Sequence, residues 1–331
     1  MKKITFIFCL VILVFFMPKM PLSQETGKLN FSGLAYTAYY YDLSKGSQDA
    51  NGFDLTRLYI TGKKSLSDEI NIRFTTDLGR VSNDQERAYY RLYMKYAYIE
   101  LKPSVNLKVL VGLHFVPFLA FEEHIWKYRS ISKMLLDLEH KQTSSDLGIK
   151  IHGQLPGEHG DFAFSLVNGE GYAQPEAGKH KGLYGRITVK PSPAKVPGLR
   201  LTLATSKIQK QANISTTITT GLLSYEAKKL TFGAEISNGS DKTGNLKTKY
   251  SGTSFFGFYR IDPKWTLIGR LDNFDPEKFT GIDKHSRIIV GIGYWINKDV
   301  EIIFDYQGVN YKEQSGSNDS NILYTHLHFN F

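Results

Sequence analysis

The sequence predicts an all-β fold, a transmembrane antiparallel β-barrel of about sixteen strands. The chain ends in a segment where apolar Leu327, Phe329 and Phe331 alternate with polar residues. Because strand side chains alternate between two faces, these three residues share one face. Segments of about ten residues with the same alternation recur along the chain, and the connectors between them are alternately short and long. Both features are typical of a bacterial outer-membrane barrel, with lipid outside and water inside.

The first 23 residues have the pattern of a cleavable export signal. Lys2 and Lys3 are followed by an apolar run at 4–17, and the small residue Ser23 precedes the expected cleavage point. The run is shorter than the roughly 20 apolar residues of a membrane-spanning helix, which is the alternative interpretation. We therefore expect a signal peptide at 1–23 and one barrel domain at 24–331. The single cysteine, Cys9, lies in the signal, so disulfides should not hold the barrel.

Composition and charge narrow the class of protein and of partner. Removal of Lys2, Lys3 and Lys19 with the signal lowers the formal net charge from +9 to +6. An exported, mildly basic chain favours small anions or acidic lipid headgroups over nucleic acid as counterparts. A mean hydropathy of -0.28 excludes a bundle of apolar helices. Barrel strands are compatible with that value, because alternation hides their lipid-facing residues in the average.

Sixteen segments have the length and alternation of barrel strands. The first eight are expected at 29–41, 53–63, 69–78, 91–102, 105–115, 146–154, 161–167 and 183–190. The other eight are expected at 199–206, 214–227, 230–237, 252–261, 265–272, 286–295, 300–307 and 322–331. Short turns such as 103–104 and 262–264 should share one rim with the termini, and long polar loops such as 44–51 and 241–249 the other. Sixteen strands leave a water-filled lumen.

The third predicted strand shows the alternation clearly. Asn71, Arg73, Thr75 and Asp77 point to one face, and the mostly apolar residues between them point to the other. A soluble β-sandwich would have the same alternation, so this pattern alone leaves that class open. The export signal, the terminal Phe331 and the tyrosines clustered near strand ends favour the membrane barrel, because aromatic rings gather at membrane interfaces.

The longest connector, 117–145, is rich in apolar residues. Ile125, Tyr128, Ile131, Leu135 and Leu138 are spaced by three or four, which predicts one or two helical turns. Following the fifth strand, this connector would be the third outer loop. Its apolar content most simply folds back into the lumen and narrows it, and a cap over the outer rim is the alternative.

Alternation also predicts which charges face the lumen. The inward basic residues are Arg57, Arg73, Lys108, Lys150, Arg186, Lys190, Arg200 and Arg270. The inward acids are Asp77, Asp146, Asp161, Glu235, Asp272, Glu301 and Asp305. Strands two to nine are therefore mostly basic inside and later strands lean acidic, which predicts a field across the pore and a weak preference for anions. The alternative is that these charges pair across neighbouring strands and only keep the lumen wet.

The segment Gly112-Leu113-His114-Phe115-Val116-Pro117-Phe118, followed by Glu122-Glu123 and Arg129, resembles a motif of the phosphate-selective porins O and P. Looser similarities occur at 57–60, 96–100 and 270–272 and at Phe331. The resemblance implies a sixteen-stranded channel, usually trimeric, whose third outer loop constricts the pore and whose basic lumen residues guide anions. This chain is shorter than most such porins. Its loop also mixes Glu122, Glu123, Asp137 and Glu139 with Lys127, Arg129, Lys133 and Lys141, which weakens the case for phosphate.

These observations lead to one expected function and two rivals. We expect a passive porin in the outer membrane of a Gram-negative-type bacterium, a homotrimer that passes small hydrophilic solutes with a weak preference for anions, phosphate among them. The charges expected to guide anions are Arg57, Arg73, Lys108, Lys150, Arg186 and Arg270 on the wall, with Lys127, Arg129 and Lys133 on the loop. Its other contacts would be outer-membrane lipid and lipopolysaccharide. No catalytic residue, cofactor or metal site is expected, and His124, His140 and His152 do not share a metal-ligand spacing on one element. The rivals are surface binding through outer loops, and hydrophobic-solute transport, for which residues 25–28 are too short a plug.

Overall fold

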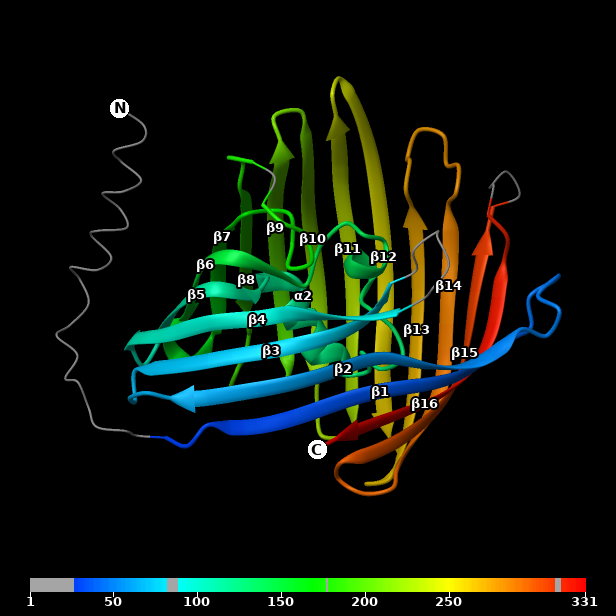
Figure 1. The fold of residues 1–331 in the computed structure, drawn as a ribbon, viewed down its shortest axis with the longest axis horizontal. Coiled ribbons are helices and arrows are strands. Elements are labelled where there is room, and N and C mark those ends of the chain that lie inside the picture. Colours follow the sequence, from blue (N-terminus) through cyan, green and yellow to red (C-terminus); the bar gives the residue numbers. More distant parts are fainter. Residues whose placement is uncertain (1–26, 82–88, 177, 313–316) are drawn as a thin grey trace.

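The computed structural model describes residues 27–81, 89–176, 178–312 and 317–331. In this part of the chain, sixteen strands form one closed antiparallel barrel (Figure 1). Each strand pairs with its neighbours in sequence, and β1 pairs with β16. The predicted fold class and strand number are confirmed. The expected signal peptide at 1–23 lies outside the described residues.

All sixteen strands fall where alternation predicts them. The first half is β1 (Asn30–Asp42), β2 (Asn51–Ser65), β3 (Ile70–Val81), β4 (Tyr89–Ser104), β5 (Leu107–Phe115), β6 (Ser145–Gln154), β7 (Gly160–Val167) and β8 (Gly182–Val189). The second half is β9 (Leu199–Gln211), β10 (Ile214–Glu226), β11 (Leu230–Thr243), β12 (Leu246–Arg260), β13 (Trp265–Asp275), β14 (His285–Trp295), β15 (Val300–Tyr311) and β16 (Ser320–Asn330). The helices are α2 (Pro117–Trp126), α3 (Leu135–Leu138) and a 3-10 turn at Pro156–Glu158. None of the helices in the described residues is long and apolar enough to cross a membrane.

The last strand closes the barrel against the first. The register of β1 on β16 runs from Leu34 opposite Asn330 to Asp42 opposite Ile322. At the end of the chain, the Gly33 amide donates a 2.6 Å hydrogen bond to the Phe331 carbonyl. Closure satisfies the backbone groups that an open sheet edge would leave unpaired.

The two faces of the wall differ in the way that alternation predicts. In β9, Leu201 and Leu203 are 49% and 57% exposed, whereas Thr202 and Ala204 between and after them are buried. Large exposed apolar residues of the same kind occur on most other strands, for example Leu147, Phe255 and Leu271. The outer face is therefore apolar, as a lipid-facing surface requires.

One expected loop is wrong. β11 runs to Thr243 and β12 begins at Leu246, so the polar stretch 241–249 is a tight hairpin, with Gly244 at φ +62°, instead of a long loop. The backbone pairing of β11 with β12 continues beyond the last residues that alternate between apolar and polar. Where both faces of a hairpin meet water, neither face needs to be apolar, and the period-two signal disappears although the strands persist.

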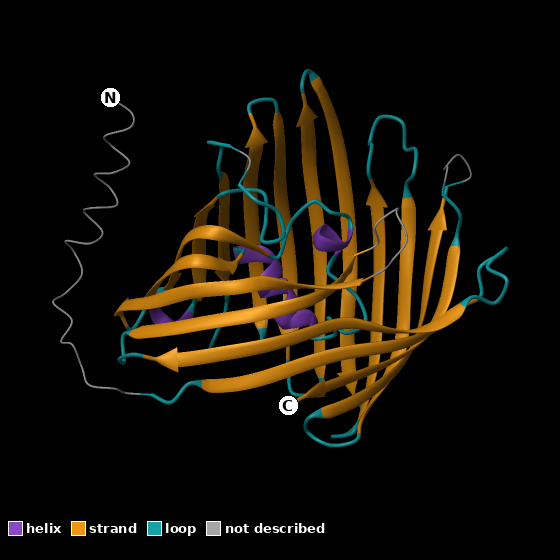
Figure 2. Ribbon diagram, viewed as in Figure 1, coloured by secondary structure: helices purple, strands orange, loops and turns teal. Residues whose placement is uncertain are grey.

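The connector between β5 and β6, residues 116–144, carries both α-helices, which Figure 2 shows as most of the helical structure in an otherwise stranded molecule. Pro117 is suited to the start of α2 because the first helical amides have no acceptor within the helix. Helical turns were expected here and are confirmed, although Tyr128 and Ile131 lie in a non-helical stretch between the two helices. We call residues 116–144 the β5–β6 segment.

The β5–β6 segment contributes a large part of the buried apolar core. Its Leu119, Ile125, Trp126, Met134 and Leu135 have no exposed surface. They cluster with wall residues that are also buried, Ile218, Phe256, Ile268, Ile289 and Ile303. Helix α2 packs against β7, β8 and β11, and α3 packs against β12. The inner face of β10–β15 is thus partly apolar where the segment packs, which pure apolar-out and polar-in alternation does not predict.

Candidate functional site

All six predicted wall cations lie on the inner face of the barrel. They are Arg57, Arg73, Lys108, Lys150, Arg186 and Arg270, on β2, β3, β5, β6, β8 and β13. Arg186 is 8% exposed beside Ile187 at 43%, and Arg270 is 2% exposed beside Leu271 at 50%. Alternation locates these residues correctly, and their role toward a solute stays a prediction.

Half of these cations are paired with carboxylates. The arginine pairs of the inner face include Arg57 with Asp77, Arg186 with Asp161, Arg200 with Glu226, and Arg270 with Asp272. The first three pairs join neighbouring strands and the fourth lies along one strand. At these positions the charges neutralise each other, as the pairing alternative predicted, and little net field remains.

Arg73, Lys108 and Lys150 form no ion pair among the described residues. The Arg73 guanidinium lies 4.7 Å from the centre of the Tyr96 ring, and its Nε donates to Thr75 Oγ1 at 3.1 Å. The Lys150 ammonium lies 3.3 Å from the centre of the Phe115 ring and is buried. Aromatic faces stabilise a cation without cancelling its charge. The three residues lie on β3, β5 and β6, next to the Glu100 carboxylate of β4, and basic residues outnumber acidic ones in this part of the wall.

A fourth such cation, Lys95 of β4, was not predicted. Tyr96 pairs with Thr75 and Met94 pairs with Thr76, which leaves Lys95 as the extra residue of a β-bulge. The bulge places both Lys95 and Tyr96 on the inner face, whereas Met94 is 44% exposed on the outer face, and Lys95 is 2% exposed. An insertion of one residue shifts the period-two pattern locally, so alternation could not locate this side chain.

Lys95 belongs to a buried cluster centred on the Tyr59 hydroxyl. Lys95 Nζ and Arg57 Nη1 each donate to that oxygen at 2.6 Å. Arg57 Nη1 also lies 2.6 Å from Asp77 Oδ2, and the Tyr172 hydroxyl donates to the same carboxylate oxygen at 3.3 Å. Tyr172 comes from the connector between β7 and β8. The cluster therefore holds two cations and one carboxylate, of which only Arg57 contacts Asp77, and it has an excess positive charge.

Predicted charges of the β5–β6 segment form a row of ion pairs. Arg129 Nε lies 2.8 Å from Glu123 Oε1, and Arg129 Nη2 lies 3.2 Å from Asp137 Oδ2. Lys133 Nζ lies 3.5 Å from the other oxygen of Asp137, and the Lys133 side chain is more exposed than that of Arg129. Lys127 reaches the wall instead, with its Nζ 3.1 Å from Glu226 Oε1 of β10. The mixed charges of this segment thus largely cancel, and Lys127 and Lys133 are its most exposed paired cations.

Glu122 differs from the other predicted residues of the segment. It has no exposed surface, and neither carboxylate oxygen has a hydrogen-bond partner among the described residues. Burial, and next the nearby Glu235 carboxylate of β11, raise the pKa of the Glu122 carboxyl well above its ordinary value. Burial against the wall therefore favours the neutral form of Glu122 and keeps its carboxyl away from solvent.

Polar bonds attach the segment to the far wall. Arg270 donates to the Lys133 carbonyl, and Glu139 accepts from His285 at 3.1 Å and from Arg287 at 3.0 Å. Lys141 Nζ lies 2.7 Å from Asp241 Oδ2 of β11. These contacts with β11, β13 and β14 fix the segment on the acidic side of the barrel. Within the described residues, no group of three or more His, Cys, Asp or Glu side chains is placed to hold a metal ion.

No protein-family model matches the sequence, and no curated protein matches it either. Solved structures with the same fold include an anion-selective porin from Comamonas acidovorans, with a TM-score of 0.70 and 11% identity over 92% of this chain and 100% of that chain. The outer-membrane channel DcaP of Acinetobacter baumannii matches with a TM-score of 0.63 and 11% identity over 93% of this chain and 99% of that chain. OmpT of Vibrio cholerae in its trimer form matches with a TM-score of 0.62 and 10% identity over 92% of this chain and 100% of that chain. The chain therefore has the sixteen-stranded fold of outer-membrane porins.

Proposed function

We propose that this protein is an outer-membrane porin, a water-filled channel through which small hydrophilic solutes diffuse. The observation that carries the proposal is the closed sixteen-stranded wall with an apolar outer face and a charged inner face. A barrel of this size is too wide for wall side chains to fill. The fold shared with outer-membrane porins supports the same conclusion.

We propose that the β5–β6 segment is the third outer loop, folded into the lumen so that it constricts the channel. Its attachment to β11, β13 and β14 and the packing of α2 on β7, β8 and β11 support this arrangement. A cap on the outer rim would contact strand ends, whereas Arg270 lies in the middle of β13. The passage would then run between the segment and the wall formed by the first strands.

A weak anion preference follows from where the charges remain uncancelled. Arg73, Lys95, Lys108 and Lys150 form no ion pair among the described residues, and they lie on four consecutive strands, β3 to β6. The acidic side of the barrel is covered by the segment, which pairs or buries several of its carboxylates. A fixed positive field at a narrow point lowers the energy of an anion relative to a cation. Among the residues predicted to guide anions, Arg73 and Lys108 fit best, because each is partly exposed and forms no ion pair among the described residues.

Phosphate is one candidate anion, through the resemblance to phosphate-selective porins. We also propose cleavage of residues 1–23 on export, residence in the outer membrane with lipid and lipopolysaccharide around the wall, and a homotrimer like the trimer form of OmpT. Surface adhesion receives less support, because the connectors 212–213 and 244–245 on the outer rim are only tight turns.

Swelling of proteoliposomes tests the channel directly. Liposomes with the refolded protein should swell in small sugars and less in larger ones, while liposomes with heat-unfolded protein should not swell. A reversal potential measured across a KCl gradient should have the sign of a modest chloride preference. Absence of swelling by a barrel that circular dichroism shows to be folded would refute the channel, and a cation-selective potential would refute the anion preference alone.

A further inference from the structure

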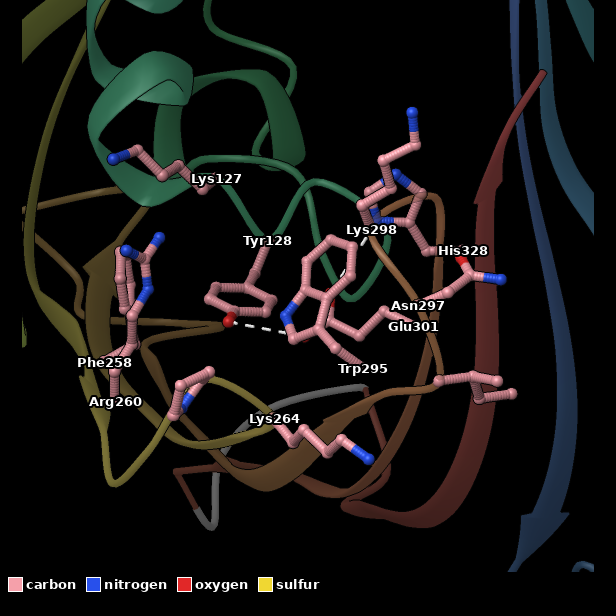
Figure 3. Close-up of a pocket in the computed structure, with 12 residues that line it drawn as sticks. Lys127, Tyr128, Phe258, Arg260, Lys264, Trp295, Asn297, Lys298, Glu301 and His328 are labelled. Atoms are coloured by element: carbon pink, nitrogen blue, oxygen red, sulfur yellow. Dashed lines mark hydrogen bonds and ion pairs between the residues drawn. The ribbon is translucent and has the colours of Figure 1, made fainter.

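A cavity of about 550 Å³ lies between the β5–β6 segment and the rim of short turns (Figure 3). Its lining comes from the residues just after α2, from β12, β14, β15 and β16, and from the β12–β13 and β14–β15 turns. None of the residues predicted to guide anions contributes to it except Lys127. The cavity is therefore distinct from the basic wall of β3 to β6.

Aromatic rings form much of the cavity surface. The Tyr128 and Phe258 rings are 5.2 Å apart and nearly perpendicular, and the Trp295 ring lies 5.9 Å from the His328 ring. Edge-to-face pairs leave ring faces and edges open to a further aromatic group. The Tyr128 hydroxyl is turned toward Glu301, with 3.5 Å between its oxygen and Oε1. An aromatic or other flat apolar body is the group that such a surface accepts.

Cations surround the same cavity. Arg260 and Lys264 are exposed and form no ion pair among the described residues, although Arg260 lies 5.8 Å from the Phe258 ring. Lys298 is 4.0 Å from Asp299, and its side chain is 89% exposed. Glu301 is the only acidic residue of the lining. Figure 3 shows Arg260 on the side of the cavity away from His328, so an anionic group is accommodated there and not beside Glu301.

We propose that this cavity binds an organic anion made of an aromatic ring and one carboxylate. The ring packs among Tyr128, Phe258 and Trp295, and the carboxylate pairs with Arg260 and Lys264. A simple inorganic anion leaves the aromatic surface unused, and a neutral aromatic compound leaves the cations unpaired. This inference names a class of solute that the channel holds near the rim of short turns. It rests on the proposed channel function, because the solute reaches the cavity through the channel.

Isothermal titration of the folded barrel in detergent tests the assignment with benzoate as the probe. Acetate carries the charge without the ring, and benzyl alcohol carries the ring without the charge. We expect benzoate to bind at least about tenfold more tightly than either comparison compound, because only benzoate uses both surfaces. Equal affinity for acetate and benzoate, or no benzoate binding by a folded barrel, would overturn the proposal.

Substitutions locate the site. The double variant Arg260→Gln with Lys264→Gln should weaken benzoate binding by about tenfold, because two charge-assisted contacts are lost. Lys278→Gln, an exposed lysine on the opposite rim, is the matched control and should bind as the unsubstituted protein does. Lys298→Gln removes a cation on the His328 side of the cavity, away from Arg260, and should leave benzoate binding nearly unchanged. Unchanged binding in the double variant, or equal weakening by Lys298→Gln, would overturn the assignment.

Binding and conduction fail independently in these experiments. A barrel that conducts ions but does not bind benzoate removes this inference and leaves the channel intact. A barrel that binds benzoate in detergent but never conducts in a bilayer refutes the channel and retains the binding site.

Discussion

Replacement of Trp126 by alanine should release the β5–β6 segment from the wall. Trp126 has no exposed surface, and its ring lies 5.7 Å from the Phe256 ring of β12 and 5.8 Å from the Tyr128 ring. The Arg270 guanidinium lies 5.8 Å from the same ring, and Nε1 donates to the Ser132 carbonyl at 3.3 Å. These contacts hold the segment to the wall or to itself, and none of them joins two strands.

The size of the expected effect follows from the complete burial of the Trp126 side chain. Truncation of a fully buried tryptophan to alanine costs about 3–5 kcal/mol, which includes the lost ring contacts and the cavity left behind. Because strand pairing is untouched, we expect this cost to fall on docking of the segment. A loss of that size multiplies the population of undocked segments by about 100 to 1,000 or more, at about 1.4 kcal/mol for each factor of ten.

Single-channel conductance in KCl measures the result. Trp126→Ala should give a larger or noisier conductance than the unsubstituted protein, while the β-strand signal in circular dichroism stays the same. Trp265→Ala is the matched control, because Trp265 begins β13 and is 40% exposed on the outer face. If Trp126→Ala conducts like the unsubstituted channel, the segment does not limit the passage and the reasoning fails.

Three further predictions test charge, protonation and backbone geometry. Arg73→Gln should lower the chloride-to-potassium permeability ratio by about threefold. A unit charge about 7 Å from an ion contributes about 0.6 kcal/mol in water and about 0.3 kcal/mol at 0.1 M salt, with opposite signs for chloride and potassium, so the two ions differ by about 0.6 kcal/mol. Lys278→Gln should leave the ratio unchanged, and an equal shift in both variants would show that Arg73 has no special position. Because the folded state raises the pKa of Glu122, the stability that its proton confers is complete below about pH 4.5 and falls as the pH rises toward the raised pKa. Thermal unfolding in detergent should therefore show a decline from acidic to alkaline pH that Glu122→Gln reduces, and identical pH profiles would contradict this. Gly112→Ala should destabilise the barrel by about 1–3 kcal/mol, because Gly112 has φ +123° and a Cβ there would lie 2.3 Å from the Ala97 carbonyl oxygen. Gly269→Ala, where a Cβ meets no atom within 4 Å, should have little effect on the melting temperature, and similar losses in both variants would refute the steric argument.

The sequence predicts the wall well because one physical rule governs it. A strand between lipid and water must alternate, so Leu201, Leu203 and Thr202 reveal both the strand and its orientation. The alternation is lost where a strand no longer lies between lipid and water. At 241–249 both faces meet water, and β11 and β12 extend beyond the last apolar residue.

The site is less predictable because its geometry depends on contacts distant in sequence. Alternation places Arg57 and Arg270 inside but cannot show that Asp77 and Asp272 neutralise them. A bulge opposite β3 places Lys95 and Tyr96 on the same face, so no single alternating pattern covers the whole of β4. The sequence shows that Glu122 lies in an apolar segment. Its burial beside Glu235 depends on how α2 packs against β11, which the sequence alone does not show.

Planar-bilayer recording tests the central claim that the wall encloses a water-filled passage across a membrane. Addition of the refolded, unsubstituted protein to a bilayer in KCl should produce discrete, uniform steps of conductance that grow in number with the amount of protein. A folded protein that co-floats with lipid vesicles yet gives no step over many trials would contradict the claim.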